Sequence, residues 1–253
     1  MQPNRGADGG QTPEPMMPGE ATAVREVEDR LASLNLLVGT ISHAIRGQLT
    51  GLDGGIYLVK SGAARSDTER MTRGLAMVER NADRIRSTVL NILYYAKDRE
   101  PVREPVFAPD LVEELAEPVR KRCDEAGIAL STEIASGAGE LRADPKAVRS
   151  LVLNMLESAL EACAADSGEG RHRIRLSVFP EAEQIVFQVR DSGRGLDPET
   201  VKKVSSPLFA SKIEGAALGL FISNKIAAAH GGSFRVDPGA GDGNTVTARL
   251  PKG

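Results

Sequence analysis

The sequence has few of the features that mark disulfide-linked, metal-binding or nucleic-acid-binding proteins. Its 253 residues include two cysteines and three histidines, which form neither a disulfide framework nor the Cys/His spacing of a metal site. The net charge at pH 7 is only −3, so nothing favours binding to a polyanion, and we expect no nucleic-acid partner. The sparse cysteines fit a reducing compartment, and we predict a cytoplasmic location.

The sequence also lacks a long apolar run. No segment approaches the ~20 consecutive apolar residues that a membrane-spanning helix needs, so we expect no membrane association. Residues 1–21 are rich in proline and glycine and have no apolar core, unlike a signal or transit peptide. We expect this segment to be a disordered N-terminus.

Two apolar stripes at helical spacing occupy residues 22–99. The first runs from Val24 to Val59 in steps of three and four, and the second runs from Met71 to Ala96. Each stripe is typical of a helix that buries one narrow face. A turn at residues 61–66 makes the pair a helical hairpin, and two hairpins can cover their stripes by closing a four-helix bundle. We therefore predict a homodimer.

Beyond this hairpin the pattern changes, after three prolines between residues 98 and 109. Periodicity predicts helices over residues 110–126, 145–164 and 216–230, with another helix opened by Pro198. Alternation predicts strands over residues 128–134, 173–179, 184–190, 233–236 and 245–250. For residues 106–253 this order indicates a sheet covered on one face by helices, so the whole chain is expected to be α+β.

His43 lies within the first stripe but does not belong to it. At 100° per residue it is about 160–200° from Ile41 and Ile45 around the helix, so it should face solvent. An exposed imidazole has a pKa near 6.5, which leaves one nitrogen free to act as a nucleophile at neutral pH. A surface histidine without a role gives the same pattern.

Residues 42–50 (SHAIRGQLT) resemble the phosphoacceptor box of two-component sensor histidine kinases. The resemblance extends from about residue 23 to the C-terminus, and it implies that His43 accepts the γ-phosphoryl group of ATP. Three positions depart from the family. Ala44 replaces the usual acidic residue, Gly47 replaces Thr or Asn, and Gln48 replaces a proline. These departures predict a slow or one-directional enzyme.

The motif DSGRG at residues 191–195 directly follows a predicted strand. In the family that it resembles, the aspartate binds the adenine amino group and the glycines let the backbone approach the base. The resemblance therefore implies that Asp191, Gly193 and Gly195 bind nucleotide. A tight turn without a ligand gives the same short pattern.

A polar row lies on the predicted helix over residues 145–164. Asn154, Ser158 and Glu161 fall at i, i+4 and i+7, and such a row can hold phosphate oxygens and Mg²⁺, which prefers oxygen ligands. The row resembles the family's asparagine box, with Ser158 in place of the second asparagine. This implies that Asn154 and Ser158 are nucleotide and metal ligands. A solvated helix face is the alternative interpretation.

Two further segments resemble nucleotide-binding boxes of the same family. Residues 207–212 (PLFASK) resemble its phenylalanine box, and residues 215–220 (GAALGL) resemble its second glycine box with Ala217 in the middle. Helix N-terminal N–H groups there would favour anions. The binding residues implied in these segments are Lys212, Gly215, Leu218 and Gly219.

The last segment with a resemblance is the closing glycine-rich strand. Gly241, Gly243 and Thr245 match it, and Thr245 is taken as a nucleotide-binding residue. His230 is expected to stabilise a helix C-terminus, by capping or through the helix dipole. His172 is assigned no role.

Together the motifs predict a dimeric four-helix bundle followed by an α/β sandwich ATP-binding domain. The predicted function is an ATP- and Mg²⁺-dependent protein-histidine kinase that autophosphorylates His43 and passes the phosphoryl group to a response-regulator receiver aspartate. The alternative is a degenerate, non-catalytic phosphotransfer or scaffold module that binds a receiver domain. A chaperone- or topoisomerase-type ATPase is disfavoured by the hairpin that precedes so short a nucleotide domain.

Overall fold

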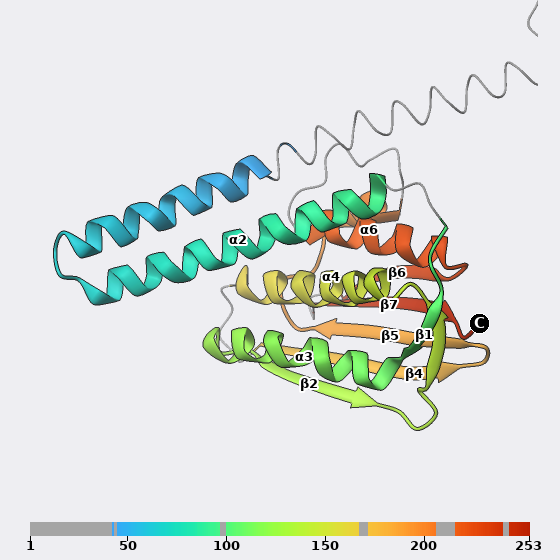
Figure 1. The fold of residues 1–253 in the computed structure, drawn as a ribbon. Helices are drawn as coiled ribbons and strands as arrows, with labels where there is room; N and C mark the ends of the chain where they lie inside the picture. The colour runs from blue at the N-terminus through green and yellow to red at the C-terminus, as the bar shows by residue number, and fades with distance from the viewer. Residues whose placement is uncertain (1–41, 43–44, 97–99, 167–171, 206–215, 240–242) are drawn as a thin grey trace, which may run out of the picture.

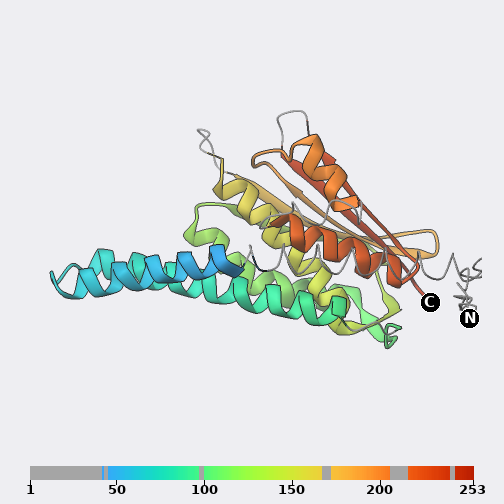
Figure 2. The same ribbon diagram turned by 90° about the horizontal axis from the view of Figure 1, so that it is seen from above.

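The computed structural model describes residues 42, 45–96, 100–166, 172–205, 216–239 and 243–253. The predictions for His43, Ala44, Lys212 and Gly215, and for the segment 1–21, lie outside these residues. A long helical hairpin lies beside an α/β unit, and its second helix runs along the helical side of that unit in both views (Figures 1 and 2).

The hairpin is formed by a helical segment over residues 45–63 and by α2 (Thr68–Ala96). The turn is shorter than predicted, because the first helix continues to residue 63 and only residues 64–66 form the turn. Asp67 begins α2, since its carboxylate accepts the Arg70 N–H at 2.9 Å, as N-cap residues do. Further along, Gln48 donates to the Thr88 hydroxyl at 2.9 Å and ties the two helices together.

Glycines set the distance between the two hairpin helices. A Cβ atom on Gly74 would lie 2.8 Å from the Gly55 carbonyl oxygen, and one on Gly55 would lie 2.9 Å from the Gly74 carbonyl oxygen. The backbones therefore approach more closely than any side chain at these positions allows. Val78 and Val59 lie beside this contact, whereas four larger apolar side chains of the hairpin are at least 40% exposed. These are Leu49, Tyr57, Leu75 and Val89.

The α/β unit contains a five-stranded sheet with the strand order β2-β4-β5-β7-β6. Only the β2–β4 pair is parallel. The strands are β2 (Ala129–Ile134), β4 (Arg173–Glu181), β5 (Gln184–Asp191), β6 (Ser233–Pro238) and β7 (Asn244–Pro251). A separate antiparallel pair consists of β1 (Glu104–Phe107) and β3 (Glu140–Ala143).

Three helices cover one face of the sheet (Figure 1), as the sequence predicted. They are α3 (Ala108–Glu125), α4 (Pro145–Ala164) and α6 (Ala216–Ala229), and the short α5 (Pro198–Ser205) packs beside α6. Asp144 caps α4 by accepting the N–H groups of Lys146 and Ala147 at 3.0 and 3.2 Å. The predicted α+β fold is therefore confirmed.

The sequence interpretation missed β1 and β3. Each strand has four residues, and β1 lies in the proline-containing stretch that was assigned only to a domain boundary. Four residues are too few for alternation to be recognised, and Pro105 on an edge strand is compatible with pairing.

Candidate functional site

Asp191 is the buried carboxylate at the C-terminal end of β5. Asp191 is only 3% exposed. Oδ1 accepts the Gly193 N–H at 2.9 Å, and the Asn244 amide donates toward Oδ1 and Oδ2 at 3.3 and 3.2 Å. Burial raises the pKa of Asp191, while the donors from Gly193 and Asn244 act in the opposite direction.

Asn244 is the residue at this site that the sequence interpretation missed. Besides contacting Asp191, its Nδ2 donates to the Arg194 carbonyl at 3.2 Å, and its Oδ1 accepts the Leu196 N–H at 2.7 Å. One amide thus ties the carboxylate to both Arg194 and Leu196 of the following loop. The predicted Thr245 is half-buried and pairs with Arg190 in the β5–β7 ladder.

The signal for Asn244 was its place directly after Gly243. Gly243 has a φ of +80°, and a Cβ there would lie 2.0 Å from the Asp191 carbonyl oxygen. Only glycine combines this conformation with so close an approach. This close approach of the backbone places the side chain of the next residue, Asn244, against the Asp191 carboxylate.

Gly193 packs against the end of α4. A Cβ on Gly193 would lie 2.3 Å from the backbone carbon of Ala162, and the next residue, Arg194, donates its N–H to the Ala162 carbonyl at 3.0 Å. The packing against α4 thus requires a glycine at position 193. The expected approach of the Gly193 backbone to a nucleotide base remains a prediction. At Gly195 a Cβ would make only ordinary contacts, at 3.5 Å or more.

Asn154 and Ser158 are buried, with 4% and 6% exposure, so the alternative of a solvated helix face is wrong. Asn154 lies at the seam between α4 and α6, and Ser158 follows it one turn later on α4. A Cβ on Gly219 of α6 would lie 3.1 Å from the Asn154 Oδ1, and Leu218 beside it is 3% exposed. The structure therefore brings the predicted residues Asn154, Leu218 and Gly219 together.

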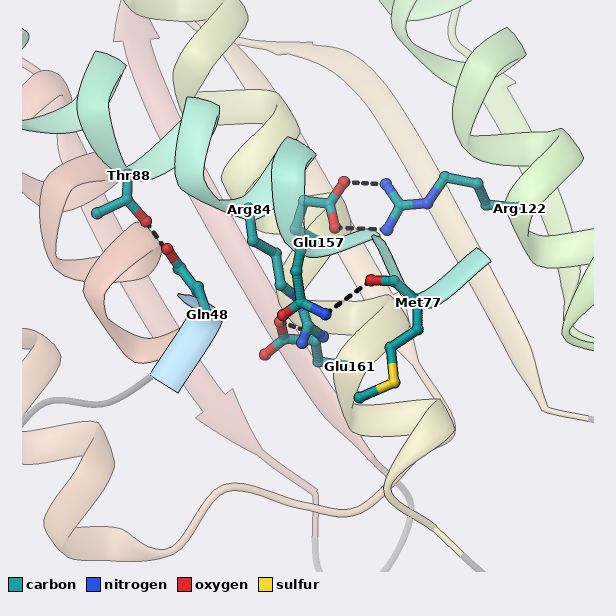
Figure 3. Close-up of polar contacts among 8 residues, drawn as sticks. Gln48, Met77, Arg84, Thr88, Arg122, Glu157 and Glu161 are labelled. Carbon is teal, nitrogen blue, oxygen red and sulfur yellow. Dashed lines mark hydrogen bonds and ion pairs between the residues drawn. The ribbon is translucent and has the colours of Figure 1, made fainter. Parts of the chain in front are cut away.

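Glu161, the last member of the predicted polar row, contacts the hairpin. Its carboxylate lies 2.8 Å from the guanidinium of Arg84 in α2, as Figure 3 shows. Four residues earlier on α4, Glu157 forms a two-point ion pair with Arg122 of α3 (Figure 3). The row on α4 thus begins at the buried Asn154, near α6, and ends at Glu161, which contacts α2.

His230 links the C-terminus of α6 to the N-terminus of α4. Its Nδ1 lies 2.7 Å from the Ile226 carbonyl, and its Nε2 accepts the Asp144 N–H at 3.0 Å. Since a backbone N–H can only donate, Nδ1 carries the proton of a neutral ring. Burial lowers the pKa of His230. The predicted capping is confirmed, and the neutral ring supplies no charge to a helix dipole.

The two cysteines are buried on α3 and α4. Burial raises the pKa of the Cys123 and Cys163 thiols to about 11, so both are protonated at neutral pH and weakly nucleophilic. Within the described ranges no group of His, Cys, Asp and Glu could hold a metal ion, and no helix is long and apolar enough to span a membrane.

Residues 143–253 match the family of histidine kinase-, DNA gyrase B- and HSP90-like ATPases. The signal transduction histidine-protein kinase AtoS of Escherichia coli is 28% identical over 223 residues, which cover 88% of this chain and 36% of AtoS. The sensor histidine kinase ZraS of E. coli is 27% identical, with 88% of this chain and 47% of ZraS covered. The chain is therefore similar in sequence to two-component sensor histidine kinases.

Solved structures of histidine kinases share the fold of this chain. Histidine kinase ThkA in complex with response regulator protein TrrA aligns with a TM-score of 0.65 and 21% identity, over 95% of this chain and 68% of that chain. Acinetobacter baumannii histidine kinase AdeS aligns with a TM-score of 0.58 and 16% identity, over 83% and 98% of the two chains. The chain spans less than half the length of AtoS and ZraS.

Proposed function

We propose that this chain is an ATP-dependent protein-histidine kinase that autophosphorylates His43 and passes the phosphoryl group to a receiver aspartate of a response regulator. The observation that carries the proposal is the fixed, buried Asp191 at the end of β5 in the ATPase domain, downstream of the helical hairpin. A carboxylate held by two donors keeps acceptor capacity for the amino group of a base.

The remaining nucleotide contacts are assigned to residues around the α4–α6 seam. Asn154 and Ser158 offer an amide and a hydroxyl oxygen, the ligand type that suits Mg²⁺, which would neutralise charge on the transferring phosphate. We propose that nucleotide is also contacted by Gly193, Gly195, Lys212, Gly215, Leu218, Gly219 and Thr245.

The phosphoacceptor assignment rests on the first hairpin helix. Arg46 and Gly47, three and four residues after His43, are exposed, and in an α-helix such residues share a face with the residue that they follow. An unprotonated imidazole nitrogen would form an N–P bond to the γ-phosphorus while the bond to the β–γ bridging oxygen breaks. ADP leaves, and the other ring nitrogen releases its proton to solvent, because Ala44 cannot accept it.

The proposed partners are a second copy of the chain and a receiver domain. The exposed apolar side chains of the hairpin, such as Tyr57 at 65%, favour a homodimeric bundle formed by residues 22–99. The ThkA structure contains a response regulator, which supports a partner of that class here. Residues 106–253 are the proposed catalytic ATP-binding domain.

Incubation of the protein with γ-labelled ATP and Mg²⁺ tests the proposal. We expect acid-labile, base-stable label on the wild type and none on His43→Ala, with Asp191→Asn reducing the initial rate at least tenfold. Arg175→Ala serves as the control outside the site, because Arg175 pairs with Glu133 and the two side chains are 58% and 56% exposed. Absence of label on the wild type with Mg²⁺ or Mn²⁺ would contradict the kinase assignment.

A non-catalytic phosphotransfer or scaffold module is the second candidate. It is favoured by the burial of Ser158, which has a hydroxyl where the resemblance implies an amide. A module of this kind accepts phosphate on His43 from a phosphorylated receiver domain and fails to bind ATP at millimolar concentration. Equilibrium nucleotide titration therefore separates the two candidates.

A further inference from the structure

His172 lies beside the loop that follows Asp191, just before the start of β4. Its ring Nδ1 is 3.2 Å from the carbonyl oxygen of Ser192, the residue directly after Asp191. A carbonyl oxygen can only accept, so Nδ1 carries a proton and donates it to Ser192. The backbone from which this ring extends is itself held, because the His172 carbonyl accepts the Ala129 N–H at 2.9 Å.

Arg173 binds the same residue of the loop. The Arg173 N–H donates to the Ser192 hydroxyl oxygen at 2.9 Å, and the Ser192 N–H donates to the Arg173 carbonyl at 3.0 Å. Three contacts from two consecutive residues therefore hold Ser192. The contact from the His172 ring is the one that a substitution outside the DSGRG motif can remove.

The carbonyl that His172 holds is connected to the Asp191 carboxylate through a single peptide unit. The Ser192 carbonyl and the Gly193 N–H belong to that unit, which is planar. The Gly193 N–H donates to Asp191 Oδ1 at 2.9 Å. Because glycine tolerates many backbone angles, this peptide could otherwise turn over at small cost. The bond from His172 therefore orients the N–H that holds the carboxylate, and consecutive hydrogen bonds of this kind strengthen one another.

The His172 ring also lies within electrostatic reach of Asp191. Burial raises the pKa of Asp191, while the Gly193 N–H, the Asn244 amide and the charge of His172 act in the opposite direction. An ionised carboxylate only accepts hydrogen bonds. It therefore suits the 6-amino group of adenine, which donates, and opposes the 6-oxo group of hypoxanthine, which accepts.

We propose that His172 is a positioning residue for base selection, whose bond to the Ser192 carbonyl aims the Asp191 carboxylate at the 6-amino group of adenine. The inference rests on the proposed binding of ATP at Asp191. Loss of the ring weakens the binding of adenine nucleotides. It leaves the binding of hypoxanthine nucleotides unchanged, because these offer the carboxylate no amino group.

Calorimetric titration of the full chain with Mg²⁺ and non-hydrolysable analogues of ATP and ITP tests this role. We expect His172→Ala to lower the affinity for the ATP analogue about fivefold, as for the loss of one hydrogen bond, and to leave the affinity for the ITP analogue unchanged. Arg175→Ala is the control, because Arg175 lies on the adjoining strand and pairs with Glu133. It should change neither affinity.

Two conservative variants separate the hydrogen bond from a general effect on folding. In His172→Asn the amide nitrogen takes the place of Nδ1, so this variant should restore the wild-type ratio of the two affinities. In His172→Gln the amide nitrogen reaches past that place, so this variant should resemble His172→Ala. Equal losses for both analogues, or failure of His172→Asn to restore the ratio, would overturn the inference and leave the proposed function standing.

Asp191→Asn shows whether His172 acts through the carboxylate. This substitution alone should reduce the preference for the ATP analogue, and adding His172→Ala should change the ratio no further, as expected for residues that act in one chain of contacts. A further change in the double variant would contradict the assigned route. Absence of binding of either analogue to the wild type would overturn the proposed function and the inference with it.

Discussion

The α/β unit and the hairpin are stabilised in different ways. In the α/β unit, large side chains such as Phe187, Phe221 and Met155 are fully buried between the sheet and its helices. In the described part of the hairpin, the buried residues are Gly55, Gly62, Gly74, Asn81 and Thr88. The first region carries its own apolar core, whereas the second depends on close backbone contact and polar ties.

This difference separates a region that can hold a precise site from a region that leaves apolar surface exposed. A close-packed core keeps Asp191 and its donors in a fixed arrangement. The hairpin leaves Leu75 and Tyr57 exposed, and such apolar surface is covered by association. The following predictions test the contrast, beginning with the largest expected effect.

Phe187→Ala should give the largest loss of stability, and this loss should fall on the α/β unit. Phe187 is fully buried on β5, and its truncation should lower the free energy of unfolding by about 3–5 kcal/mol. Urea denaturation followed by circular dichroism measures this loss. Phe107→Ala is the control, because Phe107 is 50% exposed and should cost less than about 1 kcal/mol. Similar losses at both positions would contradict the assignment of the core.

Asn244→Ala should be the next most damaging change. It removes the donor to Asp191 and to the Arg194 carbonyl and the acceptor for Leu196, so the free energy of unfolding should fall by about 2–3 kcal/mol. Asn81→Ala in the hairpin should cost less than about 1 kcal/mol, since its amide bonds only to the Met77 carbonyl one turn earlier. Thermal denaturation of the two variants decides the order.

Asn244 also shows where sequence analysis failed. The helix over residues 145–164 was predicted with its observed ends, because Asp144 and Pro145 mark its start and its apolar period is regular. The contact between Asn244 and Asp191 joins residues 53 apart in sequence, and only the β5–β7 register and the conformation of Gly243 bring them together. Periodicity and short motifs carry no such information.

The hairpin shows a second limit of the sequence. Apolar stripes predicted two helices that cover their stripes in a four-helix bundle, and the glycines were given no part in the packing. In the structure Gly55 and Gly74 bring the two backbones together beside Val59 and Val78, and glycine is a weak helix former whose presence suggested nothing about packing. Likewise, the polar row on α4 indicated the chemistry of Asn154 and Ser158 without indicating that both are buried, or that Gly219 of α6 lies against Asn154.

Gly74→Ala tests the close contact of the helices. The new Cβ would lie 2.7 Å from the Val59 nitrogen, so we expect a loss of about 1–2 kcal/mol, the cost of overpacking less the gain in helix propensity. At Gly47 nothing lies within 4 Å of a new Cβ, so Gly47→Ala should stabilise the hairpin by about 0.5–1 kcal/mol. Hydrogen exchange of the hairpin amides should be faster in Gly74→Ala and slower in Gly47→Ala than in the wild type. Slower exchange in both variants would contradict the close contact at Gly74.

The last expected effect is a pH dependence that His230 adds to the stability of the α/β unit. Burial lowers the folded-state pKa of His230 below its ordinary value near 6.5, so the folded state binds fewer protons than the unfolded state. Stability is therefore complete above about pH 6.5 and falls on acidification, by at most about 1.4 kcal/mol per pH unit. Protonation of Nε2 also removes the acceptor for the Asp144 N–H.

The difference in unfolding free energy between the wild type and His230→Gln, followed between pH 5 and 8, measures the contribution of His230 to the pH dependence. The contributions of the carboxylates cancel in this difference. The variant should be less stable at pH 7.5, and the gap should narrow toward pH 5. Residues 45–96 contain no histidine, so hydrogen exchange in the hairpin should not follow the same titration. A gap that is constant across this range would show that the bond between His230 and Asp144 does not depend on the neutral ring.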